Sequence, residues 1–297
     1  MREPDGSRAP GELGTAYGVA AYAMWGLFPI YWKALSSVDS FQILAHRVAW
    51  AFVFSLILAL ATGRGRDLAS FLRSPRRLLA SAAAGFLVTL NWGIYIWAVN
   101  SGRIIESSLG YYLNPLVSVL IGATLLREKI DKGMIAASAV ALVGIGILTV
   151  SYGRLPWVSL SLAVTFAVYG YIKKKANLDS INGLAAETAF VFPLALVFLA
   201  VEHTVGKGSF WNAGAGPTVL LTLAGPITAI PLMLYAAGVR LLPLSRMGFL
   251  QYLSPTLQLS LGVLVYGERL EGPRALAFGF ILAALTVFLA TRRKAAT

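Results

Sequence analysis

Charged side chains that stand inside long apolar stretches are the residues of this chain best suited to chemistry. Arg47, next to His46, lies in one such stretch, where an arginine costs about 2.5–3.5 kcal/mol if the stretch crosses a bilayer. The guanidinium could face a central cavity and attract a substrate carboxylate or phosphate, or it could snorkel to the nearby membrane surface. His46 has no second metal ligand close by, so it could line the same pathway or hydrogen-bond a neighbouring helix.

Glu187 is the carboxylate that lies deepest in an apolar stretch. A carboxylate in a transport pathway can take up and release a proton, which makes Glu187 the candidate for ion coupling. The alternative is a structural role as the partner of Arg47 or of a lysine near a helix end. Glu106, Glu128 and Glu268 lie at the ends of apolar stretches. Stabilising a helix end or pairing across a loop is the expected role there, and a role in transport is the alternative.

Aromatic and amide side chains gather in four of the apolar stretches and are candidates to line a substrate pathway. They are Asn91, Trp92, Tyr95, Asn100, Tyr111, Tyr112, Asn114, Tyr235, Gln251 and Tyr252. Asn91 and Tyr95 share one helical face, and Tyr111 and Asn114 share another. Because polar groups facing lipid are costly, we expect these faces to point inward, although belts at the membrane surface are the usual alternative for Trp and Tyr. A cavity lined by aromatic rings and amides suits an amphipathic solute.

Motifs for catalysis, nucleotide hydrolysis and metal binding are missing from the sequence. It holds no Walker A stretch, no nucleophile signature and no cysteine, and its two widely separated histidines do not suggest a metal site. Gly144 and Gly146 lack the third glycine of a dinucleotide-binding loop and fit close helix packing instead. The sequence therefore predicts neither an enzyme nor a bound cofactor.

The elements that hold these residues are predicted to be membrane-spanning helices. Hydrophobic residues make up 57% of the 297 residues and charged residues only 13%, about half the charged share of a soluble domain. Ten apolar segments are each long enough to cross a hydrocarbon core of ~30 Å. They cover residues 14–34, 40–62, 77–100, 104–126, 132–152, 155–172, 180–202, 217–239, 245–266 and 272–291. Because they are continuously apolar rather than alternating, helices are favoured over a β-barrel.

The positive charges predict how the chain is oriented. Of the 25 Lys and Arg residues, 18 fall in the termini and loops on one side of the segments, six on the other side, and Arg47 within a segment. Since Lys and Arg collect in cytoplasmic loops, we expect both termini in the cytoplasm and a multi-pass protein of the bacterial inner membrane. We expect no removable signal peptide before the first segment. The net charge of +12 has the same topological cause, and no basic and aromatic face for nucleic acid is evident.

The sequence repeats itself at an offset of 140 residues. Tyr112-Leu113-Asn114-Pro115 matches Tyr252-Leu253-Ser254-Pro255, and Glu128 matches Glu268. Each half contains five segments, so the second half must enter the membrane upside down. This predicts an all-α integral membrane fold of ten transmembrane helices, arranged as a 5+5 inverted-topology repeat over residues 14–152 and 153–291, with cytoplasmic tails at 1–13 and 292–297. Such repeats place a substrate site near the membrane midplane and rock one half against the other.

Pro115 and Pro255 lie near the middle of their segments. A proline there is expected to kink the helix, and the kink either acts as a hinge or shapes the bundle. No discontinuous segment of the kind that builds sodium sites is evident in the sequence.

Motifs spread over nearly the whole chain carry a family resemblance. They are Trp25-Gly26-Leu27-Phe28-Pro29, His46-Arg47, the stretches 91–100 and 106–115, Gly225-Pro226 through Pro231, Gln251-Tyr252-Leu253-Ser254-Pro255 and Gly267-Glu268-Arg269-Leu270. Together they resemble the EamA-like transporters of the drug/metabolite transporter superfamily, and specifically RarD-type permeases. The resemblance implies a 5+5 inverted repeat with both termini cytoplasmic, and the export or uptake of small metabolites.

We therefore predict a secondary active transporter of small organic metabolites or amphipathic drugs that works by alternating access. Its expected partners are a small-molecule substrate and the lipid bilayer, and nucleic acid is not expected to bind. Protons are the candidate coupling ion. Both a monomer and a homodimer are compatible with the sequence. One alternative is a facilitative exchanger without ion coupling. Another is a non-transporting membrane sensor or assembly protein.

Overall fold

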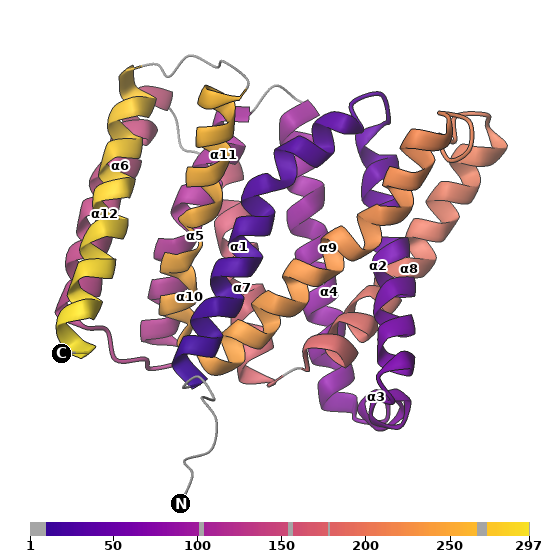
Figure 1. Cartoon of the computed structure of the whole chain (residues 1–297), viewed down its shortest axis with the longest axis horizontal. Coiled ribbons are helices and arrows are strands. Elements are labelled where there is room, and N and C mark those ends of the chain that lie inside the picture. The colour runs from indigo at the N-terminus through magenta and orange to yellow at the C-terminus, as the bar shows by residue number, and fades with distance from the viewer. Residues whose placement is uncertain (1–9, 101–103, 154–156, 178, 266–271, 297) are drawn as a thin grey trace, which may run out of the picture.

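The computed structural model describes residues 10–100, 104–153, 157–177, 179–265 and 272–296. Within these ranges it leaves out the side chains of residues 70–72, 99–100, 104–109, 152, 259, 274 and 292–296. The described residues form twelve helices (Figure 1). The helices are α1 (Pro10–Ala34), α2 (Ser40–Ala61), α3 (Gly65–Leu72), α4 (Pro75–Asn100), α5 (Ile104–Thr124), α6 (Lys132–Tyr152), α7 (Trp157–Lys175), α8 (Ser180–Thr204), α9 (Ala215–Leu241), α10 (Leu244–Leu250), α11 (Leu253–Leu264) and α12 (Gly272–Ala296).

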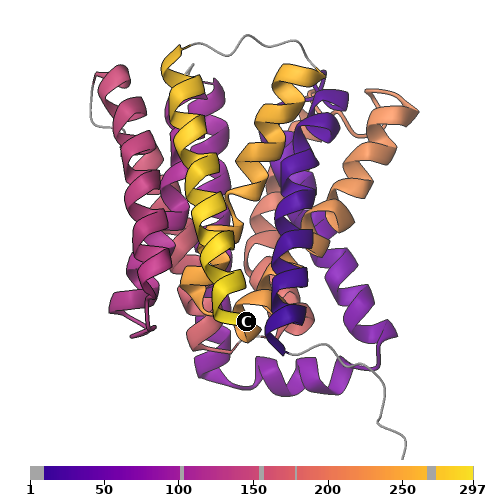
Figure 2. The ribbon, with the colours of Figure 1, turned by 60° about the vertical axis from the view of Figure 1, so that its left-hand side comes forward.

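The ten predicted segments coincide with these helices to within a few residues. Nine of them correspond to one helix each, and the ninth is shared by α10 and α11. The one remaining described helix, α3, is a short element that we did not predict, and it lies across one end of the bundle (Figure 2). By length and composition, the five helices α2, α4, α6, α8 and α9 are each apolar and long enough to cross a membrane. The protein is an all-α membrane protein.

Helix packing follows the internal repeat. Two pairs, α2 with α8 and α6 with α12, join a helix to its own mate in the other half. Other contacts occur as exchanged pairs, because α1 packs on α9 as α7 packs on α4, and α2 packs on α9 as α8 packs on α4. The α6–α12 pair stands at one edge of the bundle (Figure 1). Packing that survives the exchange of the two halves is what a two-fold relation between inverted repeats requires.

Repeat mates also perform the same local tasks. Asp39 accepts hydrogen bonds from the backbone N–H groups at the start of α2, and Asp179, 140 residues later, does the same for α8. A helix leaves its first N–H groups without partners, so an aspartate at this position stabilises the helix start. Gly85 and Gly225 are a second pair of mates. A Cβ at either position would overlap backbone of the helix packed against it, α8 or α2. The two aspartates stabilise equivalent helix starts, and the two glycines allow equivalent close helix crossings.

The ninth segment is discontinuous, contrary to our expectation of ten unbroken spans. The break lies at Gln251 and Tyr252, just before Pro255. Pro255 has no N–H to donate to the Gln251 carbonyl four residues back, and the N–H of Ser254 bonds that carbonyl instead, at 3.0 Å. The repeat mate Pro115 lies inside α5, which continues through it as one helix. Equivalent prolines therefore have different consequences in the two halves.

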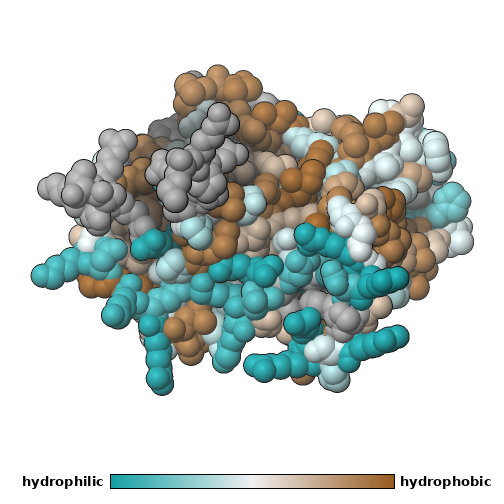
Figure 3. All heavy atoms as spheres, turned by 60° about the horizontal axis from the view of Figure 1, so that its bottom comes forward, coloured by the Kyte–Doolittle hydropathy of each residue, from teal (hydrophilic) through white to brown (hydrophobic). Residues whose placement is uncertain are grey.

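The two ends of the bundle differ in polarity. Helix α1 begins and α12 ends at the same end (Figure 1), which we call the lower end, and α3 and the α5–α6, α7–α8 and α9–α10 connections lie there too. Hydrophilic side chains gather on this end, whereas apolar ones cover much of the flank above it (Figure 3). The opposite, upper end carries the α1–α2 and α8–α9 connections.

Candidate functional site

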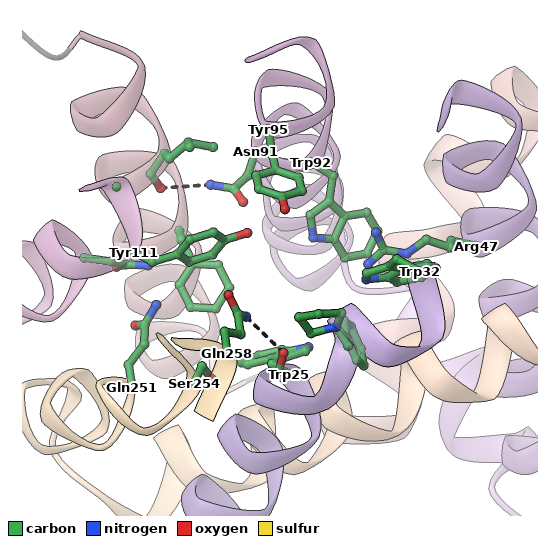
Figure 4. A pocket seen from close by; sticks show the side chains of 16 residues that line it. Trp25, Trp32, Arg47, Asn91, Trp92, Tyr95, Tyr111, Gln251, Ser254 and Gln258 are labelled. Atoms are coloured by element: carbon green, nitrogen blue, oxygen red, sulfur yellow. Dashed lines mark hydrogen bonds between the residues drawn. The ribbon is translucent and has the colours of Figure 1, made fainter. Parts of the chain in front are cut away.

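A cavity of about 230 Å³ lies inside the bundle, bordered by both halves of the chain (Figure 4). Its lining consists of Trp25, Phe28, Pro29, Trp32, Arg47, Asn91, Trp92, Tyr95, Gly110, Tyr111, Asn114, Leu162, Phe166, Gln251, Ser254 and Gln258. The lining residues of α1 and α4 come from the later part of each helix, and those of α5 and α7 from the earlier part. Because these helices alternate in direction, the cavity lies in the upper half of the bundle.

Arg47 is the cation of this cavity. Its guanidinium carbon lies 4.6 Å from the ring centroid of Trp32 and 4.4 Å from that of Trp92, so the group is held between two indole faces. Its Nε donates to the hydroxyl of Thr228 at 3.1 Å. Among the side chains that the structure describes, no carboxylate forms an ion pair with it. The guanidinium is therefore held in place without an ion-pair partner among the described side chains.

Amide side chains on several helices complete the polar lining. Asn91 uses its amide nitrogen to bind α7, donating to the Leu162 carbonyl and the Thr165 hydroxyl, both at 2.8 Å. Gln258 donates to the carbonyl of Trp25 at 3.1 Å. Gln251 also lines the cavity and is only 5% exposed, and its buried side-chain oxygen has no hydrogen-bond partner among the described residues.

A layer of aromatic rings closes the cavity toward the lower end. Trp25 and Phe166 lie at the cavity wall with ring centroids 5.7 Å apart, and both contact Tyr235. Tyr235 in turn packs on Tyr22 and Tyr169 and is 2% exposed. Such ring clusters bury large apolar areas. The aromatic layer separates the cavity from the polar lower end.

The structure brings together seven of the residues that the sequence marked as pathway candidates. These are Arg47, Asn91, Trp92, Tyr95, Tyr111, Asn114 and Gln251. It places four others elsewhere. His46 stacks on Phe210 beneath the α8–α9 connection, Tyr235 belongs to the aromatic layer, and Tyr112 and Tyr252 pack toward the α6–α12 pair. The side chain of Asn100, like those of Glu106 and Glu268, lies outside the part that the structure describes.

Sequence reasoning did not mark several lining residues as part of a site. On α1 these are Trp25, Phe28, Pro29 and Trp32, whose spacing of three, four and seven residues places them on one helical face. On α11, Ser254 and Gln258 continue the face that begins with Gln251. The spacing is visible in the sequence, but apolar aromatic residues on a membrane helix do not stand out from lipid-facing ones.

Glu187 is not among the residues that line the cavity. Its carboxylate accepts from the Lys173 ammonium at 2.5 Å and from the Tyr169 hydroxyl at 3.2 Å. Both members of the ion pair are about 1% exposed. The structure therefore pairs Glu187 with a lysine near the end of α7 and not with its repeat mate Arg47.

The lower end is held together by Glu128, which follows α5. Its carboxylate accepts hydrogen bonds from the N–H groups of Leu244 and Ser245, at 2.6 and 3.0 Å, and from the Ser245 hydroxyl at 2.7 Å. This carboxylate, which we call the Glu128 cap, stabilises the start of α10 from the other half of the chain. Lys174 of α7 donates to the carbonyls of Val239 and Leu242 at the neighbouring end of α9.

Several known proteins are similar to this chain in sequence. The profile of the EamA-like transporter family matches residues 12–150. The chain is 40% identical to Protein RarD of Streptomyces exfoliatus, over 93% of this chain and 88% of that protein. It is 42% identical to the uncharacterized transporter YojE of Bacillus subtilis, over 93% of both, and 34% identical to Protein RarD of Escherichia coli, also over 93% of both.

A solved crystal structure has the same fold. It superimposes with a TM-score of 0.73 over 94% of this chain and 97% of that one, at 20% sequence identity, a level that supports the fold alone. The names of the sequence relatives point to transporters rather than enzymes. The ten apolar segments, the inverted repeat and these relatives lead to one conclusion: the chain is a multi-pass bacterial membrane protein that belongs to the EamA-like transporter family, as a RarD-type permease.

Proposed function

We propose that this permease carries small organic solutes across the bacterial inner membrane by alternating access, with the Arg47 cavity as the solute site. The observation that carries the proposal is the guanidinium of Arg47, held between Trp32 and Trp92 at the wall of an internal cavity and without a paired carboxylate in the described lining. A structural arginine inside a membrane bundle would be expected to pair with an anion or a row of carbonyls. A solute anion supplies that partner instead.

With both termini in the cytoplasm, as the charge distribution favours, the cavity lies in the outer half of the membrane. The aromatic layer and the Glu128 cap then close the cytoplasmic side. Transport requires a second state in which the lower end opens and the upper end closes, as rocking of inverted repeats would produce. The α5–α10 crossing is one joint for such a motion, because Gly248 of α10 sits directly against Pro115 and Ser118 of α5.

Exchange or facilitated diffusion fits the surroundings of Glu187 better than proton coupling through that residue. Protonation of this carboxylate would remove its charge from the ion pair with Lys173, a buried pair in which it also accepts from the Tyr169 hydroxyl. Proton-coupled transport through Glu187 remains the second candidate, and the two are separated by an experiment described in the Discussion. A non-transporting sensor or assembly role would not explain the internal cavity and its arginine.

The proposal is tested with the purified protein in liposomes. Solute flux through the wild-type protein should be lost or strongly reduced in Arg47→Ala, while membrane insertion and elution as a single folded species stay normal. Arg240→Ala is the matched control, since Arg240 is an exposed arginine at the lower end that contacts Asn177 and Asp179. Unchanged flux in Arg47→Ala would leave the arginine with a structural role only and would remove the basis of the proposal.

A further inference from the structure

The chemistry of the cavity narrows the solute class, starting from the free edge of Arg47. A guanidinium has five N–H donors in a plane, and here Nε is used by Thr228 while Trp32 and Trp92 cover both faces. The donors left over point along the plane toward the cavity (Figure 4). Two parallel N–H groups match the two oxygens of a carboxylate in a bidentate pair. The rest of a solute bound in this way would lie between the aromatic rings of the cavity.

The size and walls of the cavity favour a single flat ring. A volume of about 230 Å³ lies below the usual range of 300–1,000 Å³ for sites that hold drug-sized ligands. Beyond Arg47 the walls are formed by Tyr95 and Tyr111, whose centroids lie 5.7 Å apart, and on another side by Trp25 and Phe166. Rings stacked or packed edge to face stabilise an aromatic solute beyond what its buried area provides.

The charge of the lining selects against an amine. Of the lining side chains that the structure describes, Arg47 is the one that is charged, and none is a carboxylate. An ammonium would therefore have no ion-pair partner among these described side chains and would lie close to a like charge, which is destabilising in a site of low dielectric. Aromatic faces can bind a cation, but those of Trp32 and Trp92 that lie nearest already hold the guanidinium.

Gln251 supplies the second polar contact. Its side-chain amide lines the cavity, and Figure 4 shows Gln251 and Arg47 on opposite sides of the cavity. A solute that reaches both needs a carboxylate at one end and a group that hydrogen-bonds an amide, such as a ring hydroxyl, at the other.

Building on the proposed function, we propose that the cargo of this permease is a small aromatic monocarboxylate whose ring carries a hydroxyl or similar hydrogen-bonding group. Arg47 binds the carboxylate, the aromatic walls hold the ring and the Gln251 amide hydrogen-bonds the ring hydroxyl. Aromatic amines and amino acids are excluded, since the former lack the anion and the latter add an unpaired ammonium beside the guanidinium.

Four commercially available probes with a common ring skeleton test this inference: 3-(4-hydroxyphenyl)propionate, 3-phenylpropionate, tyramine and tyrosine. Binding is measured by calorimetry on the purified full chain in detergent, at a pH where the acids are ionised. We expect 3-(4-hydroxyphenyl)propionate to bind at least about tenfold more tightly than tyramine, which lacks the carboxylate of the charge-assisted pair, and than tyrosine, which adds an ammonium near the guanidinium. Arg47→Gln should weaken its binding by about tenfold or more, and Arg47→Lys should recover only part of the loss. Gln251→Leu should abolish the preference for the hydroxylated acid over 3-phenylpropionate.

Flux of the same probes into liposomes, with protein-free liposomes as the baseline, separates the two proposals. If the hydroxylated acid binds in an Arg47-dependent manner but does not cross, the solute class is right and the transport function is wrong. If tyramine or tyrosine crosses and binds as well as the acid, transport stands and the solute class is wrong. Failure of all four probes to bind, or equal binding to Arg47→Gln that folds normally, also overturns the inference.

Discussion

Glu187 and Lys173 form an ion pair of 2.5 Å in the interior of the bundle, with each side chain about 1% exposed. By the 140-residue offset, Glu187 is the mate of Arg47. Equivalent positions in the two halves therefore carry opposite charges with different surroundings. One charge is neutralised by a neighbouring lysine, and the other faces the cavity. The inverted repeat is thus symmetric in its packing but not in its chemistry, which is how one central site can be built from two related halves.

Breaking the Lys173–Glu187 pair should destabilise the protein. Replacing one partner leaves the other as an unpaired buried charge, and such changes typically cost about 3–5 kcal/mol. We expect Glu187→Leu or Lys173→Met to lower the midpoint of thermal unfolding in detergent, and the double variant to recover most of the loss. The exposed pair Arg64–Asp179, where Arg64 is 41% exposed, serves as the control. Arg64→Gln should cost less than about 1 kcal/mol. A double variant no more stable than the single ones would contradict a pairwise role.

The same carboxylate decides between exchange and proton coupling. We expect wild-type protein in liposomes to exchange labelled solute for unlabelled solute, and an imposed pH gradient to produce no accumulation. Glu187→Gln, studied at a temperature where it remains folded, should exchange solute as well. Accumulation driven by the gradient in the wild type and lost in Glu187→Gln would establish proton coupling instead.

Removal of the Glu128 cap should open the lower end. Glu128 holds the start of α10 through three hydrogen bonds to a charged acceptor, each worth about 1.5–3 kcal/mol. The chain has no native cysteine, so Ser118→Cys provides a single buried label site between the cavity and the cap. Labelling of this thiol by a water-soluble maleimide should be about tenfold faster in Glu128→Ala.

Glu202→Ala is the matched control for this experiment. Its carboxylate accepts from Gln42 near the upper end, far from the Glu128 cap in the bundle. The labelling rate of Ser118→Cys should not change in this background. Equal acceleration by both substitutions would show general loosening of the protein rather than opening of the lower end.

Both termini should face the cytoplasm. The prediction rests on the excess of Lys and Arg in the termini and loops of the lower end. A reporter enzyme that is active only in the periplasm, fused after Thr297, should stay silent, and a fusion within the α8–α9 connection should be active. Strong activity of the C-terminal fusion would reverse the topology and place the cavity in the inner half of the membrane.

Much of this fold is encoded locally. The ten apolar segments appear in the sequence because each helix must cover its own length of hydrocarbon with apolar residues. The 140-residue repeat is likewise visible in matching residues, and its odd number of segments per half dictates the inversion. Arg47 stands out for a similar reason, since a charge inside an apolar membrane segment is costly and indicates a paired or functional residue.

The tertiary structure alone decided which faces meet. Tyr235 is the repeat mate of Tyr95, yet Tyr235 is buried in helix packing whereas Tyr95 lines the cavity. Tyr112 likewise packs toward the α6–α12 pair, although its neighbour Tyr111 lines the cavity. A membrane helix is apolar on all sides, so its pattern carries little information about which side faces lipid, a neighbour or a cavity. For the same reason, the sequence alone did not determine which cation pairs with Glu187. Choosing Lys173 over Arg47 depends on how α7, α8 and α2 are rotated and packed, and that rotation is set by contacts between segments far apart in the chain.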